Sequence, residues 1–271
     1  MGLLIFVLIL GAVYLWFIGS YPRRPESAAF LVGKLYAHRG LHDGNDRVVE
    51  NSLEAFRLAV EEGYGIELDV QPTRDGRLAV FHDDSLKRLC GGDVRIRDLT
   101  WEELEAYPLP DGSRIPLFQE VLDLVAGKVP LIVEIKHYGD ARRNARLALE
   151  ALKAYAGPYC VESFHPLALW HFRFHAPHIL RGQLASGGKR EGEASSLEHF
   201  AMKYLLVNWI GRPHFVAYSS ASDHNLSVWL HKFLWFRQTL LVAWTIRDQA
   251  ALDRARRHYQ MFIFEGFRPD H

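Results

Sequence analysis

Four short motifs place ionisable side chains where apolar runs end. They read Ala-His38-Arg39-Gly40, Gly-Ile-Glu67-Leu-Asp69-Val, Val-Phe-His82-Asp83 and Val-Glu134-Ile-Lys136. If the runs are β-strands, side chains two residues apart share one face, so each Glu-x-Asp or Glu-x-Lys pair points the same way. Two carboxylates on one inward face repel each other and favour a hard cation with oxygen ligands, such as Mg²⁺ or Ca²⁺.

Together these motifs supply the groups that phosphodiester cleavage requires. A divalent cation polarises phosphoryl oxygens, and a guanidinium such as that of Arg39 can hold a phosphate through two hydrogen bonds. Two imidazoles can serve as general base and general acid for the attacking and leaving oxygens. We therefore expect His38 and His82 to share the proton transfers of a phosphodiesterase.

Each motif alone also has a structural explanation. A histidine at a strand end is more often a hydrogen-bonded structural residue, an exposed Glu-x-Asp pair is ordinarily solvated, and Glu-x-Lys is commonly an ion pair. The functional interpretation rests on four charged clusters that each end an otherwise apolar segment. Burying so many ionisable groups without a function would be costly.

Nine apolar segments are candidates for the strands that position these groups: residues 34–38, 65–72, 78–82, 130–136, 159–164, 179–185, 215–219, 240–246 and 261–264. Helical patterns between them cover residues 52–62, 114–126, 141–155, 225–237 and 248–258, with Ser52 and Asp248 as expected N-caps. Strands that alternate with helices predict parallel pairing. Eight such units form a TIM-type (β/α)8 barrel, whose catalytic groups gather at the carboxyl ends of the strands. One of the nine segments is then an edge or accessory strand, and the sequence does not show which. We expect residues 86–116 to form a small excursion after the third strand.

The composition of the chain argues against nucleic acid as a binding partner. The 271 residues contain 32 Lys and Arg against 32 Asp and Glu, which gives no overall attraction to nucleic acid. Hydrophobic residues make up 49% of the chain, enough for a large core. The two cysteines, Cys90 and Cys160, have neither the number nor the spacing of a disulfide framework or a zinc site.

The amino-terminal segment is apolar and uncharged from residue 2 to residue 19. We expect residues 1–20 to be a transmembrane anchor, with a cleaved signal peptide and a buried core helix as the alternatives. Arg23 and Arg24 follow the segment, which predicts a single-pass membrane protein with a cytoplasmic catalytic domain. Residues 21–33 would be a linker and residues 34–271 the catalytic barrel.

The order of the motifs resembles the glycerophosphodiester phosphodiesterases, within the TIM-barrel superfamily that includes phosphatidylinositol phospholipase C. The resemblance covers about residues 34–271. It rests on the four motifs above together with Glu50-Asn51-Ser52, Ile115-Pro-x-x-x-Glu120, Ser163-Phe164, Gly182-Gln-Leu184 and Trp244-Thr-Ile246.

This resemblance implies hydrolysis of glycerophosphodiesters to an alcohol and glycerol 3-phosphate. It implies that His38 and His82 are the acid–base pair. It also implies a metal site at Glu67, Asp69 and Glu134, phosphate contacts from Arg39 and Lys136, support from Glu50 and Asn51, and a substrate pocket at Phe164 and Trp244. One divalent cation, Mg²⁺ or Ca²⁺, would be the cofactor.

Two segments depart from the family pattern. The last strand of the family usually reads Asp-Gly-Ile-Ile-Thr-Asp before a proline, whereas this chain has Phe262-Ile-Phe-Glu265-Gly-Phe-Arg-Pro269. The family often has Asn after Trp-Thr-Val, and here Arg247 follows Ile246. Both changes lie in the expected pocket wall, so the sequence does not show which alcohol the reaction would release.

Water-soluble diesters from deacylated phospholipids are the leading substrates, and a membrane-tethered lysophospholipase D is the alternative. A catalytically silent membrane-anchored binding module is the third possibility, which the intact histidines and carboxylates oppose.

Overall fold

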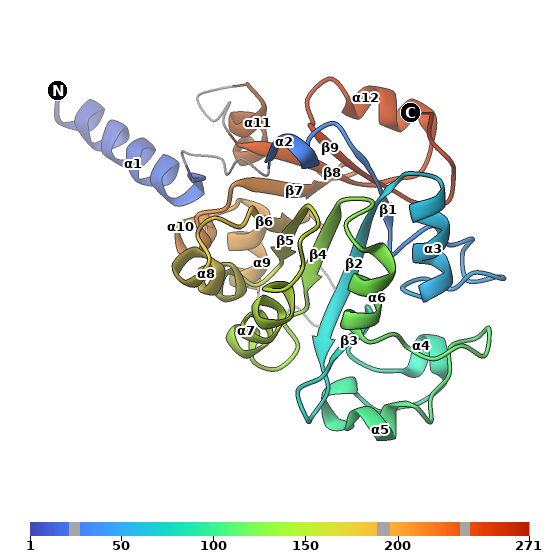
Figure 1. Cartoon of the computed structure of the whole chain (residues 1–271). Helices are drawn as coiled ribbons and strands as arrows, with labels where there is room; N and C mark the ends of the chain where they lie inside the picture. Colours follow the sequence, from blue (N-terminus) through green and yellow to red (C-terminus); the bar gives the residue numbers. More distant parts are fainter. Residues whose placement is uncertain (22–27, 189–195, 234–238, 271) are drawn as a thin grey trace.

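Eight parallel strands of the described chain form a closed barrel (Figure 1). The computed structural model describes residues 1–21, 28–188, 196–233 and 239–270. The strand β1 pairs in parallel with both β2 and β9, which closes the sheet. The TIM-type barrel predicted from the sequence is therefore confirmed. Its strands are β1 (Leu35–His38), β2 (Gly65–Pro72), β4 (Leu131–Ile135), β5 (Tyr159–Ser163), β6 (Arg181–Ala185), β7 (Phe215–Ser219), β8 (Leu240–Ile246) and β9 (Met261–Phe264).

The accessory strand is β3 (Leu78–Val80), which pairs antiparallel with β2. Only a short turn separates the two strands, and in this turn the backbone N–H of Thr73 donates to the carbonyl of Arg77 at 2.8 Å. A connection this short permits only antiparallel pairing. The strand ends before His82, but the N–H of Phe81 still donates to the carbonyl of Asp69 at 3.0 Å, which keeps His82 beside Asp69 of β2.

Helices surround the barrel on its outer side (Figure 1). The expected N-caps are confirmed, because Ser52 accepts from the N–H of Ala55 and Asp248 from the N–H of Ala251. The helix predicted over residues 225–237 is observed as α11, and residues 234–237 of that prediction lie outside the described residues. The outer helices are α3 (Leu53–Glu61), α6 (Phe118–Val125), α7 (Ala141–Leu152), α8 (Pro166–His175), α9 (Ser196–Lys203), α10 (Asn208–Gly211), α11 (Leu226–Phe233) and α12 (Gln249–Ala255).

Strand alternation divides the core into two apolar layers. Outward side chains such as Ile66 and Val133 pack under the helices. Inward side chains fill one end of the barrel with a separate cluster that includes Tyr36, Ile132, Cys160, Phe215, Val242 and Ile263. The next inward positions along the strands carry the polar groups of the motifs. The apolar cluster is therefore the floor beneath them.

The predicted excursion after the third strand is observed and has a small core of its own. It contains α4 (Lys87–Cys90), a 3₁₀ turn (Ile96–Asp98) and α5 (Trp101–Leu104). Its apolar side chains, among them Leu86, Ile96 and Trp101, pack against Phe81. This packing places the excursion beside the His82 motif.

The prediction of a transmembrane anchor, and with it a single-pass protein with a cytoplasmic domain, is wrong. No helix in the described ranges has both the length and the apolar character that a membrane crossing requires. The apolar segment forms α1 (Gly2–Ile18), which has 17 residues. At a rise of 1.5 Å per residue such a helix reaches only about 25 Å, short of a hydrocarbon core of roughly 30 Å.

The carboxyl end of α1 is bound to the barrel domain. Ile18 is fully buried, and its carbonyl accepts a hydrogen bond from Asn208 at 3.0 Å. The ring of Trp16 stacks on Trp209 of α10, and Arg212 donates to the carbonyl of Trp16 at 2.9 Å. The predicted linker, residues 21–33, contains the short helix α2 (Ala28–Leu31), and its residues 22–27 lie outside the described ranges.

Replacing Gly182 tests the packing of the barrel floor. A Cβ atom at this inward position of β6 would overlap the ring of Phe215 on β7. We expect Gly182→Ala to lower the free energy of unfolding by about 1–3 kcal/mol in urea denaturation, since a packed core resists added volume. The control is Gly11→Ala in α1, where the added Cβ meets nothing within 4 Å. It should be neutral or stabilise the protein by roughly 0.5–1 kcal/mol. Equal stability of Gly182→Ala and wild type would contradict the packing.

Candidate active site

The carboxyl ends of β1, β2 and β4 bring the predicted acid–base and metal residues to one mouth of the barrel. In the parallel pairing, His38 lies opposite Glu67, and Asp69 lies opposite Glu134. Three of these side chains are carboxylates, and all three are buried. His82 joins them from the segment just after β3. The structure therefore assembles the expected set, while the catalytic role of each member remains a prediction.

The three carboxylates form a candidate metal site. One oxygen from each of Glu67, Asp69 and Glu134 lies within 4.8 Å of the others. Burial, followed by the charges of Asp69 and Glu134, raises the pKa of Glu67 well above its usual value. The ligand atoms would be carboxylate oxygens, which are hard donors for a metal. The raised pKa of Glu67 shows that its negative charge is not fully compensated by positive groups nearby. A divalent cation such as Mg²⁺ or Ca²⁺ fits such a set.

Lys136 supplies positive charge to this cluster from within the chain. Its ammonium nitrogen lies 2.7 Å from an oxygen of Asp69 and 2.7 Å from an oxygen of Glu134. Burial opposes the charge of Lys136, but the two carboxylates raise its pKa above the usual value. Burial would likewise raise the pKa of Asp69, which Lys136 and its other cationic neighbours hold well below the usual value. The lysine predicted to contact phosphate thus pairs here with two metal-site carboxylates.

The backbone around Arg39 is held in an unusual conformation. Arg39 has a φ of 56°, in the left-handed region, and the following Gly40 has a φ of 81°. A Cβ at Gly40 would come within 2.8 Å of Ala55 in α3, so the turn requires glycine on both counts. The N–H of Arg39 donates to Glu67 at 3.1 Å, which joins the turn to the candidate metal site.

Glu50 and Asn51 both contact this turn, while the supporting role that the resemblance implies for them remains a prediction. Glu50 accepts from the Arg39 guanidinium at 2.7 Å. Asn51 donates its backbone N–H to the carbonyl of Arg39 at 2.8 Å and its side-chain N–H to Asp69, also at 2.8 Å. Burial would raise the pKa of Glu50, but Arg88 and Arg39 hold it well below its usual value. Glu50 is therefore a permanent anion between two arginines.

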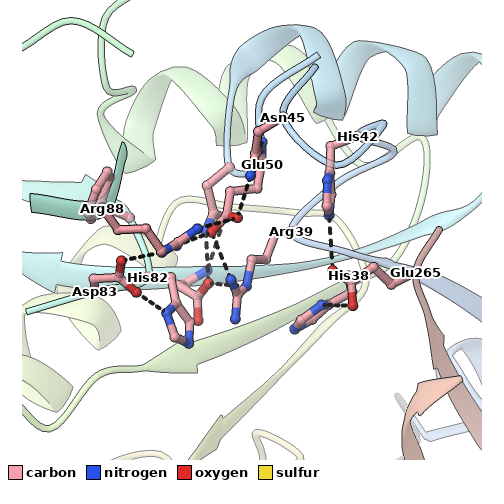
Figure 2. A network of polar contacts seen from close by, with 12 residues as sticks. His38, Arg39, His42, Asn45, Glu50, His82, Asp83, Arg88 and Glu265 are labelled. Atoms are coloured by element: carbon pink, nitrogen blue, oxygen red, sulfur yellow. Dashed lines mark hydrogen bonds and ion pairs between the residues drawn. The ribbon is translucent and has the colours of Figure 1, made fainter. Parts of the chain in front are cut away.

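A chain of ion pairs links His82 to Arg39 (Figure 2). The Nδ1 atom of His82 lies 2.6 Å from Asp83, and the other oxygen of Asp83 accepts from Arg88 at 2.6 Å. Arg88 then donates twice to Glu50, at 2.7 and 3.0 Å. Asp83 stood in the motif but was not assigned a role, and Arg88 was missed. No local pattern could reveal that Arg88 joins Asp83 to Glu50, because Glu50 is 38 residues away.

The environment of His38 includes a carboxylate that the sequence analysis treated only as a departure from the family pattern. His38 Nδ1 lies 3.5 Å from Glu265, and its Nε2 lies 3.9 Å from Glu67. Burial lowers the pKa of His38, and Glu265 opposes that shift. The signal for Glu265 was present in the alternation of Met261, Ile263 and residue 265 on the inward face of β9.

Another missed acidic residue is Glu162 on β5. It is buried, lies opposite Glu134 in the parallel pairing, and contributes to the raised pKa of Glu67.

The two predicted pocket residues, Phe164 and Trp244, contact each other edge to face with ring centres 5.9 Å apart. Their role in binding substrate remains a prediction.

Comparison with known proteins identifies a family whose members are similar to this chain in sequence. The sequence model of the "Glycerophosphoryl diester phosphodiesterase family" matches residues 38–262. A glycerophosphodiester phosphodiesterase of Bacillus altitudinis is 36% identical over 160 residues, which cover 54% of this chain and 64% of the relative. A human lysophospholipase D is 34% identical over 119 residues, 39% of this chain and 37% of that protein. The matches thus span less than two thirds of either relative.

Solved structures share the barrel. A glycerophosphodiester phosphodiesterase from Thermotoga maritima superposes with a TM-score of 0.64 and 29% identity, covering 85% of this chain and 93% of its own. A phosphodiesterase from Oleispira antarctica, determined in complex with the product sn-glycerol-3-phosphate, gives a TM-score of 0.70 at 23% identity, covering 89% and 95%.

Replacing Lys136 tests the charge balance of the cluster. In EDTA we expect Lys136→Met to lower the free energy of unfolding by about 3–5 kcal/mol, because two buried carboxylates lose their cation. Added Mg²⁺ or Ca²⁺ should restore more stability to this variant than to wild type, as measured by thermal unfolding. The control is Lys153→Met, whose pair with Glu150 is exposed, and it should change stability by less than about 1 kcal/mol. Wild-type stability of Lys136→Met in EDTA would contradict the assignment.

Proposed function

The chain belongs to the glycerophosphoryl diester phosphodiesterase family, and from that membership we propose that it hydrolyses glycerophosphodiesters to an alcohol and glycerol 3-phosphate. One observation carries the proposal: the buried triad of Glu67, Asp69 and Glu134 lies at the same barrel mouth as His38 and His82. The similar Oleispira structure holds glycerol 3-phosphate, the product this reaction would release.

The triad would hold the divalent cation. A bound Mg²⁺ or Ca²⁺ would polarise the phosphoryl oxygens and offset negative charge on the phosphate. Arg39 is the side chain best placed to grip the same phosphate, because its backbone N–H already binds Glu67 and its guanidinium is fixed by Glu50. An arginine held in this way loses little freedom when a phosphate binds.

The two histidines would transfer the protons. Each has its Nδ1 atom turned to a carboxylate, His82 to Asp83 and His38 to Glu265, so each Nε2 atom is available for the substrate. One Nε2 takes the proton of the attacking oxygen as the new P–O bond forms. The other donates a proton to the leaving alcohol oxygen as the old P–O bond breaks. With water consumed, the products are the free alcohol and glycerol 3-phosphate.

A second candidate keeps the chemistry and changes the substrate. The similarity to a human lysophospholipase D favours lysophospholipids as alternative diesters. Phe164 and Trp244 would then line the apolar part of the pocket. A catalytically silent binding module is less well supported, because His38, His82 and the three carboxylates are all present.

Substrate and metal requirements can be measured together. We expect the protein with Mg²⁺ or Ca²⁺ to release glycerol 3-phosphate from glycerophosphocholine, and EDTA to abolish the release because the triad loses its cation. Lysophosphatidylcholine, assayed in parallel for release of choline, tests the second candidate. Absence of turnover on both substrates, with divalent cation present, would favour the silent module.

The acid–base pair is tested by substitution. We expect His38→Ala and His82→Ala each to reduce kcat by about 10²–10⁴-fold, the usual contribution of general acid or base catalysis. Circular dichroism should show a folded barrel in both. His178→Ala is the matched control, since His178 is exposed on the surface and should keep wild-type turnover. Near-normal kcat in both active-site variants would disprove the assignment.

A further inference from the structure

Glu265 lies among three side chains that can donate hydrogen bonds, and Figure 2 shows two of them, His38 and His42. One of its oxygens is 3.5 Å from His38 Nδ1 and 2.8 Å from a guanidinium nitrogen of Arg247. Its other oxygen is 3.7 Å from His42 Nε2. Within the described residues, neither of these two ring nitrogens, both buried, has a hydrogen-bond partner at closer range.

The backbone fixes Glu265 in this place. It follows β9 directly, where Phe264 lies opposite Ala37 of β1, so the next residues along the two strands, Glu265 and His38, are neighbours. On the other side, the N–H of Glu265 donates to the carbonyl of Ile246 at 2.9 Å. Arg247, the next residue after Ile246, therefore reaches Glu265 from β8. His38 at the end of β1 and Arg247 just after β8 thus approach the carboxylate from opposite sides.

The contacts determine which ring nitrogens carry protons. A carboxylate only accepts, and Glu265, 3.5 Å from Nδ1, is nearer to the His38 ring than Glu67, 3.9 Å from Nε2. We therefore place the proton of His38 on Nδ1, which leaves the lone pair on Nε2. In His42, Nδ1 accepts from the N–H of Gly44 at 3.2 Å, so the proton lies on the Nε2 that faces Glu265. The nearby His38 ring lowers the pKa of Glu265 to about 2, which keeps it ionised. Distances near 3.5 Å are long, but catalytic hydrogen bonds commonly shorten when substrate binds.

We propose that Glu265 is a positioning residue for His38, holding its ring and its Nδ1 proton so that Nε2 faces the substrate, and that Arg247 acts only by holding Glu265. The proposal rests on the proposed function for its kinetic consequences. It unites the two departures from the family pattern, because the glutamate at the end of β9 and the arginine after β8 form one ion pair.

The alternative is a surface ion pair that merely joins two loops. Arg247 is largely exposed, and its pair with Glu265 resembles the pair of Arg268 with Glu62, in exposure and in the same 2.8 Å distance. Glu62 has no catalytic histidine among its described ion-pair partners. Glu62→Gln is therefore the matched control, because it removes a similar ion pair without touching His38.

The experiment compares kcat and KM for glycerophosphocholine in Glu265→Gln, Glu265→Asp, Arg247→Met and Glu62→Gln. Loss of an orienting partner should lower kcat of Glu265→Gln by roughly 10- to 100-fold, with KM unchanged. Glu265→Asp should recover part of that loss, because the negative charge returns. Arg247→Met should have a smaller effect, and the double variant Arg247→Met/Glu265→Gln should be no slower than Glu265→Gln alone.

A second readout does not depend on turnover. Nitrogen-15 NMR of the histidine rings reports which nitrogen of His38 carries the proton, and we expect the Nδ1–H form in wild type and a mixture in Glu265→Gln. An unchanged kcat or an unchanged His38 tautomer in Glu265→Gln would overturn the role of Glu265. Multiplied losses in the double variant would overturn the role given to Arg247, since that arginine would then act on its own. Failure of the proposed function would appear separately, as a wild-type protein that turns over no diester.

Discussion

Like charges buried together at the strand ends are the constraint on which the rest of the site depends. Glu67, Asp69 and Glu134 approach one another in a place from which water is largely excluded. Isolated buried carboxylates of this kind are expensive, so each needs a cation or a hydrogen-bond donor. Lys136 compensates two of them, and Asn51 donates to one. Glu67 is the least compensated, so its pKa rises and a divalent cation would complete the candidate site.

The barrel makes this arrangement possible by separating apolar from charged positions along the same inward faces. Tyr36, Ile132 and Ile263 belong to the floor, and two residues further along their strands stand His38, Glu134 and Glu265. A rigid floor matters because catalytic groups must be held within a fraction of an ångström of their working positions. Helices outside the barrel affect the site through the turns against which they pack, as α3 does at Gly40.

Much of this could be predicted from the sequence, for identifiable reasons. All nine strand segments were found because short β-branched and aliphatic runs between polar turns are distinctive. Which strand was accessory could not be known, since it depends on the short turn at Thr73 rather than on the strand itself. The apolar first segment was misinterpreted because apolarity alone does not set helix length, and α1 ends at Ile18 where its carbonyls are bound by Asn208 and Arg212. Long-range partners such as Arg88 leave no local trace in the sequence.

The excursion after β3 also constrains how such proteins can diverge. Arg88 belongs to this inserted segment, yet it binds Asp83 and Glu50, which belong to the barrel motifs on either side of the site. A chimaera that exchanged the excursion alone would bring a new surface but lose the bridge between the two motifs. The segment can therefore be transplanted only as a module that carries its arginine, or together with compensating changes at Glu50 and Asp83. A segment that looks peripheral is in this sense tied to the site itself.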